Sequence, residues 1–197
     1  MITFSLNTFI KICLLDTGGR ISEIQKRLTG SGGYDFYKPF QNAVRAHCDG
    51  NAAKAENLIQ APSNDAERKH NSAAYDEFKS RFGSTKSLSS LKNTKKLRFP
   101  TAGIEISVDP LFELSKSGVR QTYSVWVAQN PQLTQRYGAL ACYVMRQAFA
   151  NSNLANSSFF YADIVQGKTY SEKQITNNTS LILAADVNSL GTLVKEL

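Results

Sequence analysis

The hydrophobic periodicity of this 197-residue chain changes near its middle. Up to residue 83, apolar residues recur at helical spacing, as Phe36, Phe40 and Val44 do. Beyond residue 100, apolar and polar residues alternate, as they do at 104–108, which is typical of a half-buried strand. The sequence therefore predicts an α+β fold, in which a helical N-terminal half precedes a small mixed β-sheet with flanking helices.

The second half is predicted to run in the order β-β-β-α-β-α. The expected elements are strands at 96–99, 104–108 (extending through 111–114) and 122–128, a helix at 133–148, a strand at 159–165 with a return at 169–170, and a segment at 179–196 that suits either a helix or a strand. A hairpin turn is expected at 116–118. The predicted regions are 1–83 (helical), 84–94 (basic connector) and 95–197 (α/β), and the two larger ones could share one core.

Positive charge is concentrated between Glu77 and Glu105. This stretch has seven basic residues and no acidic one, whereas residues 101–197 are neutral overall, so the net charge of +7 belongs to the first hundred residues. Such asymmetry favours a polyanionic partner. The residues predicted to contact a nucleic-acid backbone are Lys86, Lys92, Lys95, Lys96 and Arg98. The same segment could instead be a flexible tether, and the sequence does not decide between these states.

Aromatic residues are sparse around the basic segment, where only Phe82 and Phe99 flank it. That scarcity argues against base stacking and favours sequence-independent contact with phosphates. A second aromatic group, Tyr34 to Phe40, surrounds the start of a predicted helix. The run at 159–161 cannot place all its rings on one side of a sheet, so we expect it to pack in the core or against a partner chain.

The three cysteines, Cys13, Cys48 and Cys142, are widely spaced and lie in apolar contexts. They are best explained as buried free thiols in a reducing compartment, which predicts a cytoplasmic protein. Residues 1–15 are interpreted as an amphipathic helix rather than a signal peptide. No stretch approaches the ~18 apolar residues that a membrane span needs, so no membrane association is expected.

The order of elements after residue 95 resembles the core of the restriction-endonuclease-like, or PD-(D/E)xK, superfamily. That resemblance implies an acid on the second strand and an acid-x-lysine trio on the third, which together hold Mg²⁺. Asp109 stands at the matching place, with Glu113 nearby, whereas the strand at 121–127 has neither acid nor lysine. The motif is therefore degenerate, and the resemblance implies an inactive nuclease-like fold, which would suit bacterial genome defence.

No cofactor, metal site or catalytic set is predicted, although Asp109, Glu113 and Glu105 are the candidates should the chain be catalytic. The leading hypothesis is a non-catalytic cytoplasmic binding protein, or a subunit of a larger complex, that contacts a nucleic-acid backbone. A metal-dependent nuclease using those three acids is one alternative. The other is a protein–protein adaptor, in which the partner is another protein or a second copy of the chain.

Overall fold

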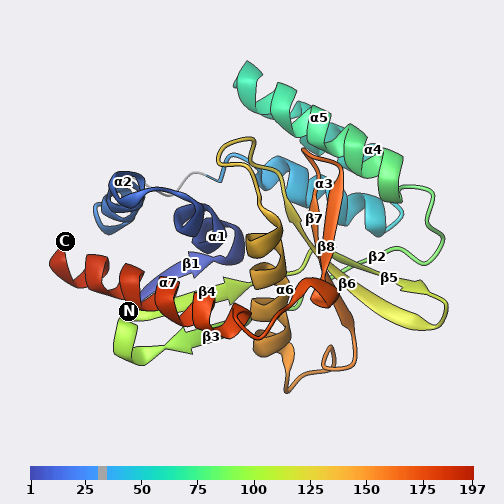
Figure 1. Cartoon of the computed structure of the whole chain (residues 1–197). Helices are drawn as coiled ribbons and strands as arrows, with labels where there is room; N and C mark the ends of the chain where they lie inside the picture. The colour runs from blue at the N-terminus through green and yellow to red at the C-terminus, as the bar shows by residue number, and fades with distance from the viewer. Residues whose placement is uncertain (31–34) are drawn as a thin grey trace.

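The computed structural model describes residues 1–30 and 35–197 and has the α+β fold that the sequence predicts (Figure 1). Two sheets run side by side: one with the strand order β1–β4–β3, the other with the order β2–β5–β6–β7–β8. The strands are β1 (Ile2–Ser5), β2 (Ser89–Ser90), β3 (Lys95–Phe99), β4 (Ile104–Val108), β5 (Phe112–Lys116), β6 (Val119–Trp126), β7 (Ser158–Asp163) and β8 (Lys168–Ser171).

Seven α-helices surround these sheets within the described ranges, and α6 lies between them (Figure 1). They are α1 (Leu6–Leu14), α2 (Thr17–Leu28), α3 (Lys38–Cys48), α4 (Ala52–Gln60), α5 (Asp65–Phe82), α6 (Gln135–Phe149) and α7 (Thr179–Glu196). Within the sheets, β1 pairs with β4 and β6 with β7 in parallel, and the other pairs are antiparallel. Helix α6 supplies the crossover that parallel β6 and β7 require.

The helix boundaries follow local sequence signals. Asn64 caps α5 by accepting the backbone N–H groups of Ala66 and Glu67, and Pro39 stands in the first turn of α3, where a missing N–H costs nothing. At the predicted hairpin, Ser117 and Gly118 both have positive φ, and Gly118 tolerates it without strain. The predicted hairpin is confirmed, and the segment at 179–196 is a helix.

Three predictions about the elements are wrong. Residues 1–15 do not form one helix, because Ile2–Ser5 is a strand that pairs with β4, more than a hundred residues away. The two glycines of the Thr17–Gly19 stretch predict the end of the first helix, but this stretch instead opens α2, with Asp16 as its cap. The expected single sheet is two sheets, because the chain breaks at Asp109–Pro110 and β5 joins the second sheet instead of extending β4. Of the second aromatic group, Tyr34 lies outside the described residues.

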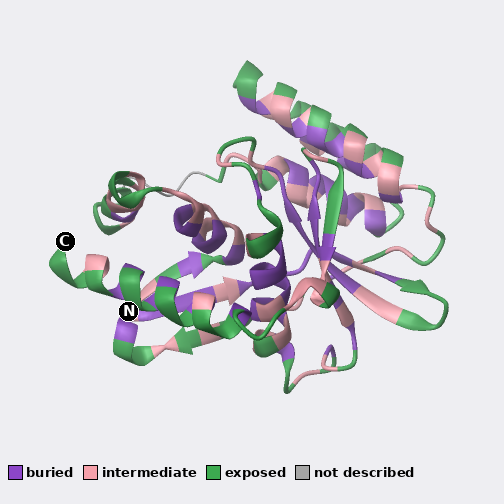
Figure 2. Ribbon diagram, viewed as in Figure 1, coloured by how far each residue is buried: buried purple, intermediate pink, exposed green. Residues whose placement is uncertain are grey.

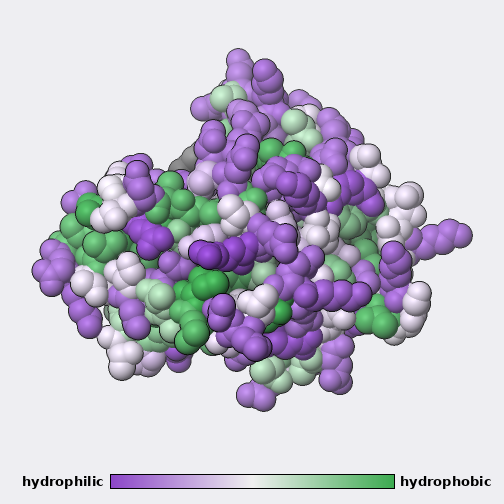
Figure 3. All heavy atoms as spheres, viewed as in Figure 1, coloured by the Kyte–Doolittle hydropathy of each residue, from purple (hydrophilic) through white to green (hydrophobic). Residues whose placement is uncertain are grey.

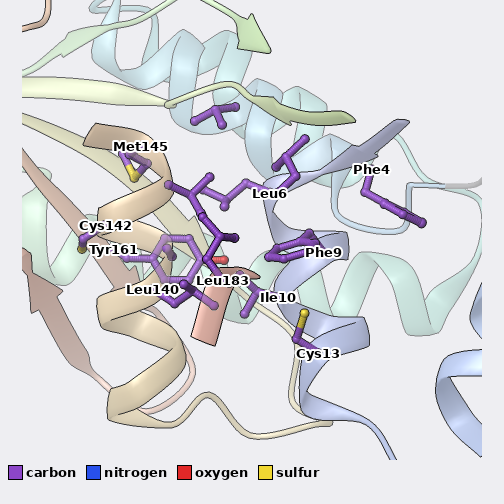
Figure 4. Close-up of a cluster of buried hydrophobic side chains, with 14 of the residues drawn as sticks. Phe4, Leu6, Phe9, Ile10, Cys13, Leu140, Cys142, Met145, Tyr161 and Leu183 are labelled. Carbon is purple, nitrogen blue, oxygen red and sulfur yellow. The ribbon is translucent and has the colours of Figure 1, made fainter. Parts of the chain in front are cut away.

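The first hydrophobic core fills the space between the three-stranded sheet, α1, α6 and α7. Figure 4 shows Phe9 and Ile10 of α1 directed towards Leu140 of α6 and Leu183 of α7. Tyr161 of β7 reaches the same cluster, so the five-stranded sheet contributes one face to this core. The buried surfaces of both sheets therefore converge on α6 (Figure 2).

The second core lies on the other face of the five-stranded sheet, where α3, α4 and α5 cover it. Tyr123 is stacked between Phe112 and Phe160, with ring centroids 4.9 Å away on each side, so an aromatic row crosses β5, β6 and β7. Phe159 and Tyr161 pack on the first core, and Phe160 packs against the second. The prediction that this run is core is thus confirmed, and the three cysteines are buried and free, as predicted.

The surface seen in Figure 3 is mainly hydrophilic, with hydrophobic residues interspersed along α7, where Leu181 is exposed. No helix in residues 1–30 or 35–197 is both long enough and apolar enough to cross a membrane.

Gly138 is required where α6 approaches β8. A Cβ at this position would lie 2.3 Å from Cγ of the buried Tyr170 ring. We expect Gly138→Ala to lower the free energy of unfolding by about 2 kcal/mol or more, because overpacking outweighs the helix-propensity gain of alanine. Urea unfolding measures the change.

The matched control is Gly18→Ala in α2, where the nearest atom to a new Cβ is 3.8 Å away. This variant should be as stable as the wild type or slightly more so. If Gly138→Ala unfolded at the same urea concentration as the wild type, the close approach of α6 to Tyr170 would be incorrect.

Candidate nucleic-acid interface

The end of the basic segment is an ordered strand. Lys95–Phe99 forms β3, which pairs with β4 along its whole length at one edge of the three-stranded sheet. Leu97 and Phe99 pack against the first core, so the alternation of a strand places Lys96 and Arg98 on the opposite, outer face. Their positions are therefore fixed by the sheet, as in a rigid patch and not as in a loose tether.

A single acid anchors both cations. Glu105 of β4 lies with one carboxylate oxygen 2.7 Å from Lys96 Nζ and the other 2.8 Å from Arg98 Nε. Thr3 Oγ1 donates a third hydrogen bond to this carboxylate over 3.0 Å. The Glu105 side chain is only 6% exposed, whereas those of Lys96 and Arg98 are 50% and 64% exposed. The cations consequently cover the acid and still present half of their surface to solvent.

This arrangement shifts the titration of Glu105. The hydrogen bond from Lys96, followed by that from Arg98, lowers the pKa of the Glu105 carboxyl to about 2. A pKa below the ordinary value means that the pairs stabilise the fold above that ordinary value. The contribution is lost as pH falls from there towards 2. At neutral pH the Glu105 carboxyl is thus ionised.

A cleft of about 780 Å³ adjoins this outer face. Its walls come from the start of α1, the start of α3 and the C-terminal end of β6. Ser5 and Ser107 line it, and the strand register places Ser107 opposite both Ser5 of β1 and Lys96 of β3. Because directly opposed residues project from the same face of a sheet, Lys96 stands beside the entrance to the cleft.

The cleft carries unbalanced positive charge. Lys11, Arg27 and Lys38 line it, together with the acids Asp35 and Asp109. Lys11 is paired with Glu23 at 3.3 Å, and Asp109 is paired with Arg45 at 2.9 Å. Neither Arg27 nor Lys38 has a carboxylate partner within the part of the chain that the structure describes.

Aromatic rings also line the cleft, and the sequence alone does not predict their place there. Phe36 and Tyr37 precede α3, and His70 comes from α5; the ring centroid of Phe36 lies 5.1 Å from that of Tyr37 and 5.9 Å from that of His70. The two aromatics that flank the basic segment, Phe82 and Phe99, pack in the two cores instead. Only the tertiary fold brings α3 and α5 to the basic surface, so the sequence shows the aromatic group at the start of α3 but not that its rings lie beside the cations.

The other predicted backbone-contact residues are dispersed. Lys95 is exposed on β3 but points to the face opposite Lys96. Lys86 is exposed next to Ser87, whose hydroxyl donates to the Ser115 carbonyl beside the β5–β6 hairpin. Lys92 is exposed in the loop before β3. The structure therefore places Lys96 beside the cleft, Arg98 next to it on the same face of β3, and Lys86 with the hairpin.

The three candidate catalytic acids form ion pairs with different basic residues. Glu105 binds Lys96 and Arg98, Asp109 binds Arg45, and Glu113 lies 2.6 Å from Arg120. Of these acids, only Asp109 lines the cleft. Among the described residues, no group of three or more His, Cys, Asp or Glu side chains could hold a metal ion.

The strand expected to carry an acid-x-lysine trio contributes Ser124 and Trp126 to the cleft. These residues are two apart on β6, so both side chains lie on the same face, the one that contributes Trp126 to the first core. Neither side chain is ionisable, and Asp109 stands at the end of a strand in the other sheet.

No protein-family model matches the sequence, and a search of curated proteins gives no significant match. One solved structure with a similar fold is a protein from Eubacterium rectale provisionally described as an exonuclease, at 13% identity and a TM-score of 0.45, over 86% of this chain and 71% of that one. Another is SSO0001, at 13% identity and a TM-score of 0.32, over 89% of this chain and 88% of that one. Similarity at this level carries no argument about function.

Removing Lys96 should change the titration of Glu105. In Lys96→Met, which keeps the length of the side chain, the largest cause of the low pKa is lost, so the pKa of Glu105 should rise from about 2 towards its ordinary value. Carbon-13 NMR of the carboxyl carbon over pH 2–6 measures this.

Lys95→Met removes the same charge from the opposite face of β3 and should leave the Glu105 titration unchanged. Equal shifts in both variants would mean that Glu105 senses only the general field, and the pairing geometry described above would be wrong.

Proposed function

We propose that this chain is a non-catalytic nucleic-acid-binding protein of a reducing, cytoplasmic compartment. The surface that contacts the nucleic-acid backbone would be the outer face of the β1–β4–β3 sheet together with the cleft beside it. The observation that carries the proposal is the fixed, half-exposed pair Lys96 and Arg98 on β3, of which Lys96 lies opposite Ser107 in the wall of a cleft that Arg27 and Lys38 also line. Several cations that reach one track of phosphates release counterions together, which drives binding.

The chemistry of the surface favours phosphate contact over base reading. On the outer face of the sheet, the hydroxyls of Thr3 and Ser5 already donate to Glu105 and Thr8, so the Ser107 hydroxyl and the cations are the groups that could bind phosphate oxygens. Glu105 is already saturated by three donors and hidden beneath the cations, so it presents little negative charge to an approaching strand. Binding should therefore depend strongly on salt and weakly on sequence.

Fluorescence anisotropy with a labelled duplex tests the electrostatic contribution. The wild type should bind at low salt, with an affinity that falls steeply as salt rises. The double variant Lys96→Met/Arg98→Gln should flatten the slope of log K against log salt by about 2, because each lost phosphate contact removes ~0.9. The charge-matched control is Lys54→Gln/Lys173→Gln, which alters exposed lysines outside the surface.

The variant Glu105→Gln should change the affinity for the duplex in the opposite direction. It removes the negative charge under the patch while keeping the shape of the side chain, so affinity should rise at low salt. Absence of binding by the wild type at low salt would remove the proposal. The proposal would also fail if the slope of log K against log salt flattened as much in the control variant as in the Lys96/Arg98 variant.

The non-catalytic part of the proposal has its own test. Each candidate acid is engaged by a separate cation, and Ser124 and Trp126 occupy the cleft face of β6, so we expect no cleavage of a labelled duplex or single strand with Mg²⁺ or Mn²⁺. A denaturing gel after overnight incubation would reveal cleavage. Metal-dependent cleavage that disappears in Asp109→Ala would overturn this part and restore the nuclease hypothesis.

A further inference from the structure

The N-terminus of α1 opens into the cleft. Ser5, Leu6, Asn7 and Thr8, which are the cap and first turn of this nine-residue helix, all line it. Ser5 Oγ accepts the Thr8 N–H, whereas the amides of Leu6 and Asn7 have no acceptor inside the helix. The first turn contains no acidic residue that could balance the positive end of the helix dipole.

A guanidinium adds to this positive charge instead of balancing it. Arg27 of α2 lines the same cleft and donates from Nη2 to Thr8 Oγ1 over 3.2 Å. In residues 1–30 and 35–197 it forms no ion pair, and its Nε is buried without an acceptor. A cation held against the positive end of a helix is unfavourable unless an anion lies between them.

Other donors in the same place are also unused. Trp126 is 1% exposed and lines the cleft, and its Nε1 has no acceptor among the described residues. The side-chain amide of Asn7 donates to the Val125 carbonyl over 2.8 Å, so the first turn of α1 is held against β6 at the residue next to Trp126. Thr8 Oγ1 accepts from both Ser5 and Arg27, which leaves its own proton free to donate.

From these contacts we infer that the first turn of α1, Thr8 and Arg27 form a binding site for a phosphoryl group. A phosphate supplies the negative charge that balances Arg27 and the helix terminus, and its oxygens accept from backbone amides, a hydroxyl and a guanidinium together. Buried donors without acceptors are rare in folded proteins and are normally satisfied by a bound partner or water. Two of them, the Arg27 Nε and the Trp126 Nε1, belong to residues that line the cleft beside this site.

The identity of the molecule that carries the phosphoryl group rests on the proposed function, whereas the existence of the site does not. A nucleic acid whose backbone crosses β3 could place either an end phosphate or an internal phosphodiester here. A free phosphate ester would use the same groups. These sources share one chemistry, so the test begins with inorganic phosphate and then separates them.

Nitrogen-15 NMR of the full chain, titrated with inorganic phosphate, tests the site. The amides of Leu6, Asn7 and Thr8 and the Trp126 indole N–H should shift and saturate. Arg27→Gln should weaken the affinity by about tenfold or more, because a charge-assisted, multidentate contact is lost. Arg136→Gln is the matched control, since Arg136 is exposed on α6 and does not line the cleft.

Circular dichroism establishes that both variants are folded, and the wild-type amide shifts stand independently of either. No shift at Leu6 to Thr8 in the wild type would overturn the site. Equal weakening by Arg27→Gln and Arg136→Gln would also overturn it.

Short oligonucleotides with and without a 5′-phosphate then identify the carrier. Stronger competition by the 5′-phosphorylated form would identify an end phosphate, and equal competition by both would identify the internal backbone. If neither competes while phosphate still binds, the site stands for free phosphate esters and the link to nucleic acid is wrong. Failure of the site and failure of the proposed function are thereby distinguished.

Discussion

The candidate interface depends on the side chain of Asn7, which ties the first helix to the second sheet. Its Nδ2 donates to the Val125 carbonyl of β6 over 2.8 Å, and its Oδ1 accepts from the Tyr161 hydroxyl of β7 over 2.6 Å. Both ends of the amide are therefore satisfied by strands of the five-stranded sheet, while its backbone follows β1 of the three-stranded sheet. This bridge fixes the start of α1 against the end of β6, and those two segments form walls of the cleft.

Charge is arranged around that bridge so that fixed cations face solvent. Glu105 holds Lys96 and Arg98 in place from beneath, offsets one of their two positive charges, and leaves each about half exposed. In the cleft, Arg27 is held by the Thr8 hydroxyl and not by an acid, so its charge is retained in full. Surface ion pairs contribute little to stability in general. We interpret the Glu105 pairs as positioning cations, which suits a partner that carries many phosphates.

The sequence predicts most of the helices and strands because their signals are local. The α6 stripe, the Asn64 cap and the turn at Ser117 and Gly118 each act within one element. It does not predict β1, because a four-residue strand beside a helix has no period of its own and is stabilised by pairing with β4. The sequence does not predict the cleft for the same reason: Arg27 lies on α2, Phe36 just before α3 and His70 on α5, and only the tertiary fold brings these segments together.

The most direct test of this account is a lysine-reactivity footprint of the full chain, read by mass spectrometry with and without saturating nucleic acid. The account predicts that Lys96 and Lys38, at the entrance and on the wall of the cleft, lose reactivity towards acetylation in the complex. Lys54 on α4 should react equally in both states. Protection of Lys54 with no change at Lys96 and Lys38 would contradict the account, because the nucleic acid would then bind over the helices of the second core.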